Sequence, residues 1–355
     1  MPKRCEIYGN DWTEWDLFKT RGSFFDGQKM TPRPLWGFYD DTKDSLAERQ
    51  IKTACDYGID LFIYLYYWSP LGVELQKPID TFVRASTDSQ LKFALMWSPH
   101  RPRFEVIRPI DKEFDYEKSR YFDLDEASFG EFIRYTSEHF FSKKNYFCIN
   151  NKPVLYMYKY FEFVERIGRD NFLRCVKFAN SYVKSNGFDG IYLVGSSERD
   201  PCTFKNISRL GFSATTSYVL LPDFHSGSPI QDYQEQMQKK QPRRDAYKHY
   251  GQLPYFPSVP VGFDASSRGA PGKPAPTVLA QEDVYPWFPI VKDRSLDVFS
   301  EYLKAACDFV LQTHQNPPLV NIASWNEWTQ QHFIEPDVEN SYSYLEAIRR
   351  IKRSV

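Results

Sequence analysis

The chain has 355 residues, of which 42% are hydrophobic and 17% aromatic, and its 45 basic residues nearly balance its 46 acidic ones. This length fits one large domain with a substantial core, and the near-zero net charge argues against nucleic acid as a partner. The six cysteines lie far apart, without the close pairs typical of zinc sites or disulfide frameworks. No apolar leader and no membrane span are present, so we expect a cytoplasmic protein, although an exported form with its signal removed would look the same.

Apolar runs of strand length alternate along the chain with segments of helical period. Eight such units predict an α/β fold, a (β/α)8 TIM barrel forming a single domain over residues 1 to 355. Long loops follow strands 3 and 7, at residues 98 to 125 and 264 to 294, and loops of this length are often functional. The alternative is a doubly wound open sheet, which commonly carries a glycine-rich first turn that this sequence lacks. The predicted strands are 35 to 39, 61 to 67, 92 to 97, 153 to 158, 190 to 195, 212 to 218, 258 to 263 and 319 to 324, and the predicted helices 43 to 57, 73 to 85, 126 to 141, 168 to 185, 230 to 250, 295 to 314 and 341 to 353.

Residues that follow the barrel strands are the candidates for a site, because the carboxyl ends of the strands meet at one face. They combine carboxylates, aromatic rings and cationic side chains. In chain order they are Trp68, Trp97, His100, Arg101, Tyr158, Tyr160, Glu198, Asp223, His225, Asp264, Arg268 and Glu327.

Carboxylates among aromatic side chains suit the hydrolysis of glycosidic bonds, which needs an acid for the leaving oxygen and a second carboxylate. Glu327 lies between two tryptophans in the segment SWNEWTQQHFIEPD, and no structural role for it is evident. Glu198 could instead cap a helix, and Asp264 could belong to an Asx-turn. His100 and Arg101 could pair with acids of their own loop. The histidines show no metal-binding spacing, so we expect no metal and no cofactor.

Several segments together resemble the WbsX-like family, which is related to the endo-α-mannosidases of glycoside hydrolase family 99. They are WNEW at 325 to 328, IEPD at 334 to 337, DWTEW at 11 to 15, GFYDD at 37 to 41, YGIDLFIYLYYW at 57 to 68 and INNKPVLYMY at 149 to 158. The resemblance covers nearly the whole chain and implies a (β/α)8 barrel that acts on an oligosaccharide or polysaccharide without a cofactor. The family's first strand precedes the TEW motif, so either residues 5 to 8 or 35 to 39 fill that place here, or the barrel is incomplete at its start.

In the hydrolase branch, the resemblance implies two glutamates after the eighth strand. The first assists the sugar 2-hydroxyl as an internal nucleophile and matches Glu327, whereas the second, the general acid/base, is replaced by Gln330. An amide cannot donate and recover a proton, and loss of a general acid typically costs about 10²- to 10⁴-fold in rate. Glu335, which matches a glutamate of the family pattern, is the first candidate substitute, followed by Glu198 and Asp264. Substrate contacts are expected from Trp68, Trp97, His100, Arg101, Tyr158, Tyr160, Arg268, Trp325, Asn326, Trp328 and Gln330.

The leading hypothesis is therefore a glycoside hydrolase that uses Glu327. A glycosyltransferase of surface polysaccharide biosynthesis is the second hypothesis, although the sequence contains no nucleotide-binding signature. Gln330 motivates the third, a glycan-binding protein that has lost catalysis.

Overall fold

The computed structural model describes most of the chain, and the descriptions below concern these parts only. The described residues are 12 to 18, 28, 32 to 100, 123 to 196, 207 to 220, 222 to 223, 228 to 250, 252 to 268 and 286 to 355. Arg101, Glu198 and His225 lie outside them, as do the first strand candidate at residues 5 to 8 and most of the two long loops.

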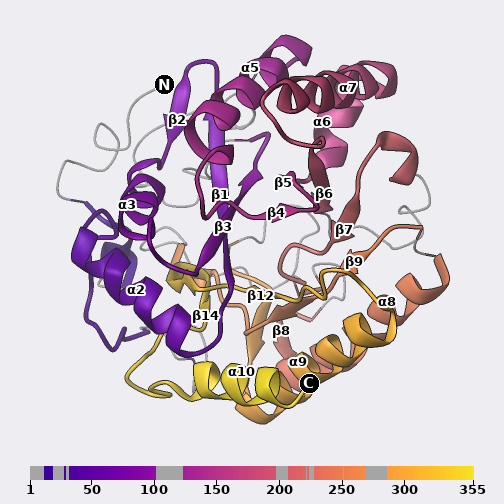
Figure 1. Ribbon diagram of the computed structural model, residues 1–355. Helices are drawn as coiled ribbons and strands as arrows, with labels where there is room; N and C mark the ends of the chain where they lie inside the picture. The colour runs from indigo at the N-terminus through magenta and orange to yellow at the C-terminus, as the bar shows by residue number, and fades with distance from the viewer. Residues whose placement is uncertain are drawn as a thin grey trace.

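A mainly parallel sheet forms the centre of the fold, as Figure 1 shows. Its parallel strands are hydrogen-bonded side by side in chain order, from β1 through β3, β5, β6 and β7 to β9. After one intervening residue β10 begins, and it forms a separate parallel pair with β12. In order, the strands are β1 (Leu61–Ser69), β3 (Lys92–Trp97), β5 (Lys152–Tyr158), β6 (Tyr192–Ser196), β7 (Ala214–Thr216), β9 (Tyr255–Phe256), β10 (Ser258–Pro260) and β12 (Asn321–Ala323).

Helices surround these strands (Figure 1), with α2 and α3 on one side, α5 to α7 on the next and α8 to α10 on the third. Each turns an apolar face inward; in α9, for example, Phe299, Leu303, Ala306 and Val310 recur at three and four residues and are buried. The helices are α2 (Asp44–Asp56), α3 (Lys77–Ala85), α5 (Glu126–Thr136), α6 (Tyr160–Ile167), α7 (Arg169–Ser185), α8 (Tyr233–Tyr250), α9 (Leu296–Gln312) and α10 (Ser343–Arg353).

Short elements complete the described fold. Two of them border the candidate site described below: the 3-10 helix η1 near the N-terminus and the hairpin of β13 and β14 that follows β12. These elements are η1 (Glu14–Phe18), β2 (Gly72–Glu74), the π-helix η3 (Ser137–Phe141), β4 (Cys148–Ile149), η5 (Ser208–Leu210), β8 (Ile230–Asp232), η6 (Ser266–Arg268), β11 (Ile290–Lys292), β13 (Asn326–Glu327), η7 (Trp328–Gln330) and β14 (His332–Phe333).

Alternate residues of the strands belong to two different cores. In β3, Phe93, Leu95 and Trp97 pack in the cluster beneath the helices, whereas Ala94 and Met96 belong to a cluster inside the curved sheet. Successive side chains of a strand point to opposite faces, so both faces of these strands are apolar. This alternation also decides which side chain at each strand end faces the interior.

The prediction of an α/β fold with a parallel sheet is confirmed, and two local predictions are corrected. Residues 35 to 39 form a turn with Gly37 at a φ of +75°, and only Pro34 makes an isolated bridge there. The helix predicted from residue 73 begins at Lys77, with a proline in its first turn, because β2 occupies the preceding residues. Helix α6 was missed, since its eight residues are too few for a clear helical period.

A side-chain contact connects β1 with the segment that follows β12. Within the described ranges no backbone ladder joins β12 to β1. Phe62 of β1 and Trp325, two residues after β12, pack with their ring centroids 4.9 Å apart. This contact brings the segment that carries Glu327 to the beginning of the sheet.

Candidate active site

Glu327 is positioned by a short hairpin directly after β12. It is the last residue of β13 and pairs with His332 of β14, while η7 forms the connection. Gln331 completes the turn in the left-handed region, at a φ of +51°. The hairpin therefore fixes both the backbone of Glu327 and that of Thr329, two residues later.

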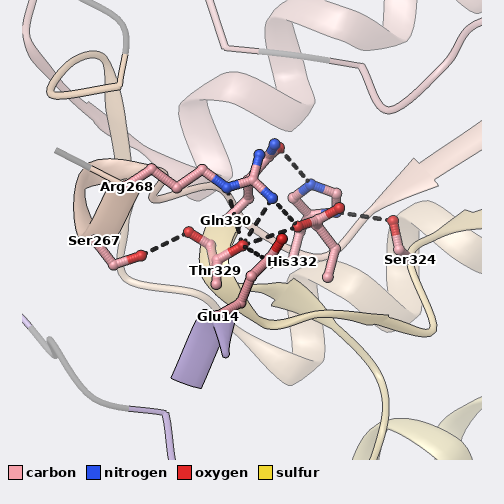
Figure 2. Close-up of polar contacts among 8 residues, drawn as sticks. Glu14, Ser267, Arg268, Ser324, Thr329, Gln330 and His332 are labelled. Atoms are coloured by element: carbon pink, nitrogen blue, oxygen red, sulfur yellow. Dashed lines mark hydrogen bonds and ion pairs between the residues drawn. The ribbon is translucent and has the colours of Figure 1, made fainter. Parts of the chain in front are cut away.

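The Glu327 carboxylate takes part in a polar cluster with Arg268 and Thr329, which also contacts Glu14. Figure 2 labels Arg268, Thr329 and Glu14. Arg268 donates from Nη2 to Glu327 Oε1 at 2.6 Å, and from Nε and Nη2 to Thr329 Oγ1 at 2.9 and 2.7 Å. The Thr329 hydroxyl is 3.2 Å from Glu327 Oε1 and 3.3 Å from Glu14 Oε2. Two carboxylates thus lie around one hydroxyl, next to one guanidinium.

Opposing effects act on the protonation of Glu327. Burial raises its pKa above the ordinary value, the Arg268 charge lowers it, and the neighbouring Glu14 raises it again. The Glu327 side chain is 29% exposed and that of Arg268 is 12% exposed. Glu327 is therefore mostly buried, but part of its side chain is accessible to a ligand.

Three tyrosines surround this cluster at the ends of different strands. Burial is the main cause that raises the pKa values of Tyr67 and Tyr218 above the ordinary value, and the charge of Glu327 contributes to both shifts. The Tyr158 ring lies 4.5 Å from that of Tyr218. With raised pKa values, the Tyr67 and Tyr218 hydroxyls are neutral at physiological pH. All three side chains offer flat faces with polar edges, which suit a sugar ring. The predicted Tyr158 is therefore joined by Tyr67 and Tyr218.

Gln330 is held by a buried histidine. Its Oε1 lies 3.0 Å from His332 Nε2, and His332 Nδ1 lies 3.0 Å from Ser324 Oγ, as seen in Figure 2. Burial and the Arg268 charge lower the pKa of His332 to about 3, so this ring is neutral and supplies no mobile proton near neutral pH. The backbone carbonyl of Gln330 accepts from the Asp264 amide at 2.7 Å.

Glu335 lies in a closed environment, with 2% of its surface exposed. Its carboxylate accepts hydrogen bonds from Tyr39 Oη at 2.5 Å, Trp328 Nε1 at 2.9 Å and Gln50 Nε2 at 2.8 Å. Burial raises its pKa to about 7, although these donors lower it. A substrate would have to displace Trp328, itself 4% exposed, to reach this carboxylate. The geometry therefore favours a positioning role for Glu335.

Asp264 forms the Asx-turn that the sequence suggested as an alternative. Its Oδ1 accepts from the Ser266 amide at 2.9 Å and from the Ser266 hydroxyl, and its Oδ2 accepts from Gln28 Nε2 at 2.9 Å. With 5% exposure it braces the turn before η6, which carries Arg268.

Several predicted substrate contacts instead lie in the core. Trp68 packs on Phe132, with ring centroids 5.5 Å apart, and Trp97, with no exposed surface, stacks on the same phenylalanine at 4.8 Å. Tyr160 is 6% exposed and packs on Phe212. The structure places these three side chains in the core beneath the helices, and their contact with a substrate stays a prediction.

Other predicted substrate contacts lie beside Tyr158 or in the hairpin that carries Glu327. His100 is 6% exposed and meets the Tyr158 ring edge-on at 5.3 Å. In the hairpin, Asn326 is exposed, Trp325 is partly buried, and Trp328 stacks on Phe333 with centroids 3.8 Å apart.

Sequence reasoning missed Glu14, Tyr67, Thr329 and Tyr218. Tyr67 comes directly before the predicted Trp68 in β1, but this strand is apolar on both faces, so no period-of-two signal shows which of the two side chains faces the cluster. Tyr218 is the last residue of a predicted strand. Glu14 lies within DWTEW, and no local signal connects it with Thr329, 315 positions away.

The described residues contain no group of histidine, cysteine or carboxylate side chains arranged to hold a metal ion. No helix in the described parts is long and apolar enough to cross a membrane.

A protein-family model matches nearly the whole chain. The family model described as Glycosyltransferase WbsX matches residues 1 to 348. Two curated proteins described as Uncharacterized protein WxcX, from two strains of Xanthomonas campestris pv. campestris, are each 24% identical over 372 residues. The match covers 99% of this chain and 47% of theirs, so the chain spans about half the length of these relatives.

Solved structures share the fold at low sequence identity. A GH99 endo-alpha-mannosidase from Bacteroides thetaiotaomicron, in complex with Bis-Tris propane, has a TM-score of 0.62 and 12% identity, covering 91% of this chain and 88% of that one. A protein described as glycoside hydrolase-like has a TM-score of 0.60 and 14% identity, covering 94% and 92%. The resemblance and the fold class predicted from sequence are thereby confirmed.

Proposed function

The chain belongs to the WbsX family, and from this premise we propose that it cleaves a glycosidic bond in an oligosaccharide or polysaccharide, with Glu327 as a reacting carboxylate. The observation that carries the proposal is the setting of Glu327 at the carboxyl end of the sheet. It is paired with Arg268, surrounded by tyrosines and 29% exposed.

Glu327 is suited to support a nucleophile. Contact with Arg268 stabilises the ionised carboxylate, whereas burial and Glu14 keep its pKa raised. A carboxylate with a raised pKa is a better proton acceptor than a solvated one, so it can take the proton of a sugar 2-hydroxyl while that oxygen attacks the anomeric carbon. The tyrosine faces would hold the sugar ring during this step.

The direct test is turnover on a panel of defined oligosaccharides, read by mass. Glu327→Gln keeps the shape of the side chain and removes its basicity, so we expect a loss of about 10³-fold or more in kcat/KM. Glu301→Gln, on the exposed face of α9, is the matched control and should behave as wild type. Unchanged turnover by Glu327→Gln would contradict the proposal.

Glycosyl transfer is the second candidate, favoured by the description of the matching family model as a glycosyltransferase. A transferase would bind an activated sugar, and a bound ligand raises thermal stability by mass action. Titration with nucleotide sugars therefore separates the two reactions. A concentration-dependent rise in Tm, with product formed only when an acceptor glycan is added, would favour transfer over hydrolysis.

A further inference from the structure

Cleavage of a glycosidic bond needs a second group that handles a proton, and the two expected carboxylates that lie among the described residues are poorly placed. Asp264 accepts hydrogen bonds within its own turn, and Glu335 is enclosed beneath Trp328. Gln330 has no ionisable group, and its neighbour His332 is neutral and buried. The second carboxylate at the Glu327 cluster is Glu14.

Glu14 is brought to the site by the packing of η1 on the hairpin. The adjacent Trp15 donates from Nε1 to the Tyr39 carbonyl at 2.8 Å, and its ring lies 6.0 Å from that of Trp328. Phe18, at the other end of η1, is buried in a cluster with Trp328 and Phe333. The apolar anchors of this short helix thus fix the position of its first residue.

The hydroxyl of Thr329 sets the separation of the two carboxylates. It lies 3.2 Å from Glu327 Oε1 and 3.3 Å from Glu14 Oε2, so these two oxygens can be no farther apart than the sum of the two distances. This upper limit admits the retaining geometry, in which the carboxyl groups are about 5 to 5.5 Å apart. No water molecule needs to fit between them in the first step.

The hydrogen bonds also indicate where the proton of the pair resides. Thr329 has one hydroxyl hydrogen, which can serve only one carboxylate at a time. Arg268 donates to Glu327 Oε1, and its positive charge stabilises the ionised form of that carboxylate, so the proton of the pair is assigned to Glu14.

We propose that Glu14 is the general acid and base of this site and replaces the carboxylate that is absent at Gln330. The inference rests on the proposed function. First, Glu14 gives its proton to the glycosidic oxygen as the bond to the anomeric carbon breaks, and the bonding electrons leave with that oxygen. Glu327 takes the proton of the 2-hydroxyl, whose oxygen bonds to the anomeric carbon.

Water completes the cycle. A water molecule attacks the anomeric carbon and gives one proton to Glu14, while the 2-oxygen leaves that carbon and recovers its proton from Glu327. Both carboxyl groups return to their starting states. One water is consumed for each bond cleaved, and the anomeric configuration is retained because the carbon is attacked twice.

The leaving group provides the sharpest test. A glycosyl fluoride departs without a proton from the enzyme, whereas a sugar alcohol requires one. For Glu14→Gln we expect kcat/KM to fall about 10²- to 10⁴-fold on the oligosaccharide identified in the panel, but less than about tenfold on the corresponding fluoride. The descending limb of the pH profile, which reports the essential acid, should also disappear.

Two further variants make the result decisive. Glu14→Asp keeps an acid in the same place and should recover part of the oligosaccharide activity, which a merely structural role would not require. Glu327→Gln should lose activity on both substrates. The role of Glu14 alone would be overturned if Glu14→Gln lost equal activity on both substrates, or lost none. The proposed function would be overturned as well if the wild-type protein showed no turnover, or if Glu327→Gln were fully active. Matching Tm values establish that each variant is folded.

Discussion

Glu327 and Glu335 belong to the same segment of the chain, yet they differ in exposure and in the groups that contact their carboxylates. Glu327 is 29% exposed and shares its hydrogen bonds with a guanidinium and a hydroxyl that also contacts Glu14. Glu335 is 2% exposed and accepts from three neutral donors. Both pKa values are raised, mainly by burial. A raised pKa therefore does not identify a reacting group; access and neighbouring charges do.

The comparison predicts a large loss of stability when Glu335 is made apolar. Glu335→Leu keeps the volume but removes the acceptor of the Tyr39 and Gln50 donors, whereas Trp328 Nε1 keeps its bond to Tyr39 Oη. Each buried unsatisfied donor costs about 1 to 3 kcal/mol. We expect the free energy of unfolding to fall by about 3 to 5 kcal/mol, measured by urea denaturation. Glu335→Gln, which retains an acceptor, is the matched control and should lose much less. A Glu335→Leu variant as stable as wild type would show that these bonds contribute little.

The pH dependence of the free energy of unfolding tests the Glu335 carboxyl group without a change in its hydrogen-bond donors. Its pKa is about 7 in the folded protein and 4.5 in the unfolded chain, so the folded state binds the proton more tightly. This contribution is complete below pH 4.5 and is lost as the pH rises through 7. The total is on the order of 3 kcal/mol at most. Relative to Glu335→Gln, the wild-type free energy of unfolding should therefore decline between pH 4.5 and 7; parallel curves for the two proteins would contradict the shift.

The smallest effect is expected at Gln330. If Glu14 already handles the proton, Gln330→Glu adds a second acid beside His332 and should change kcat/KM by less than about tenfold. Kinetics on the oligosaccharide panel measure this directly. A wild-type protein that binds sugar but is inert, together with an active Gln330→Glu, would instead support a glycan-binding protein that has lost catalysis.

The sequence by itself determined most of the secondary structure, the parallel α/β class and the family, and it predicted three residues of the proposed site, Tyr158, Arg268 and Glu327. These follow from local patterns: helical period, strand-length apolar runs and the position of polar residues after strands. The orientation of neighbouring side chains at a strand end did not follow, because strands that are apolar on both faces carry no period-of-two signal. Tyr67 and Trp68 therefore could not be told apart.

Only the tertiary structure decided which carboxylates meet. Glu14 and Thr329 are 315 positions apart, and their contact depends on the packing of Trp15 and Phe18 on the hairpin. Tertiary burial likewise separated Glu335 from Glu327, although both are glutamates of one short segment. Contacts between distant segments arise from the summed packing of the whole core, whereas sequence patterns report each segment alone.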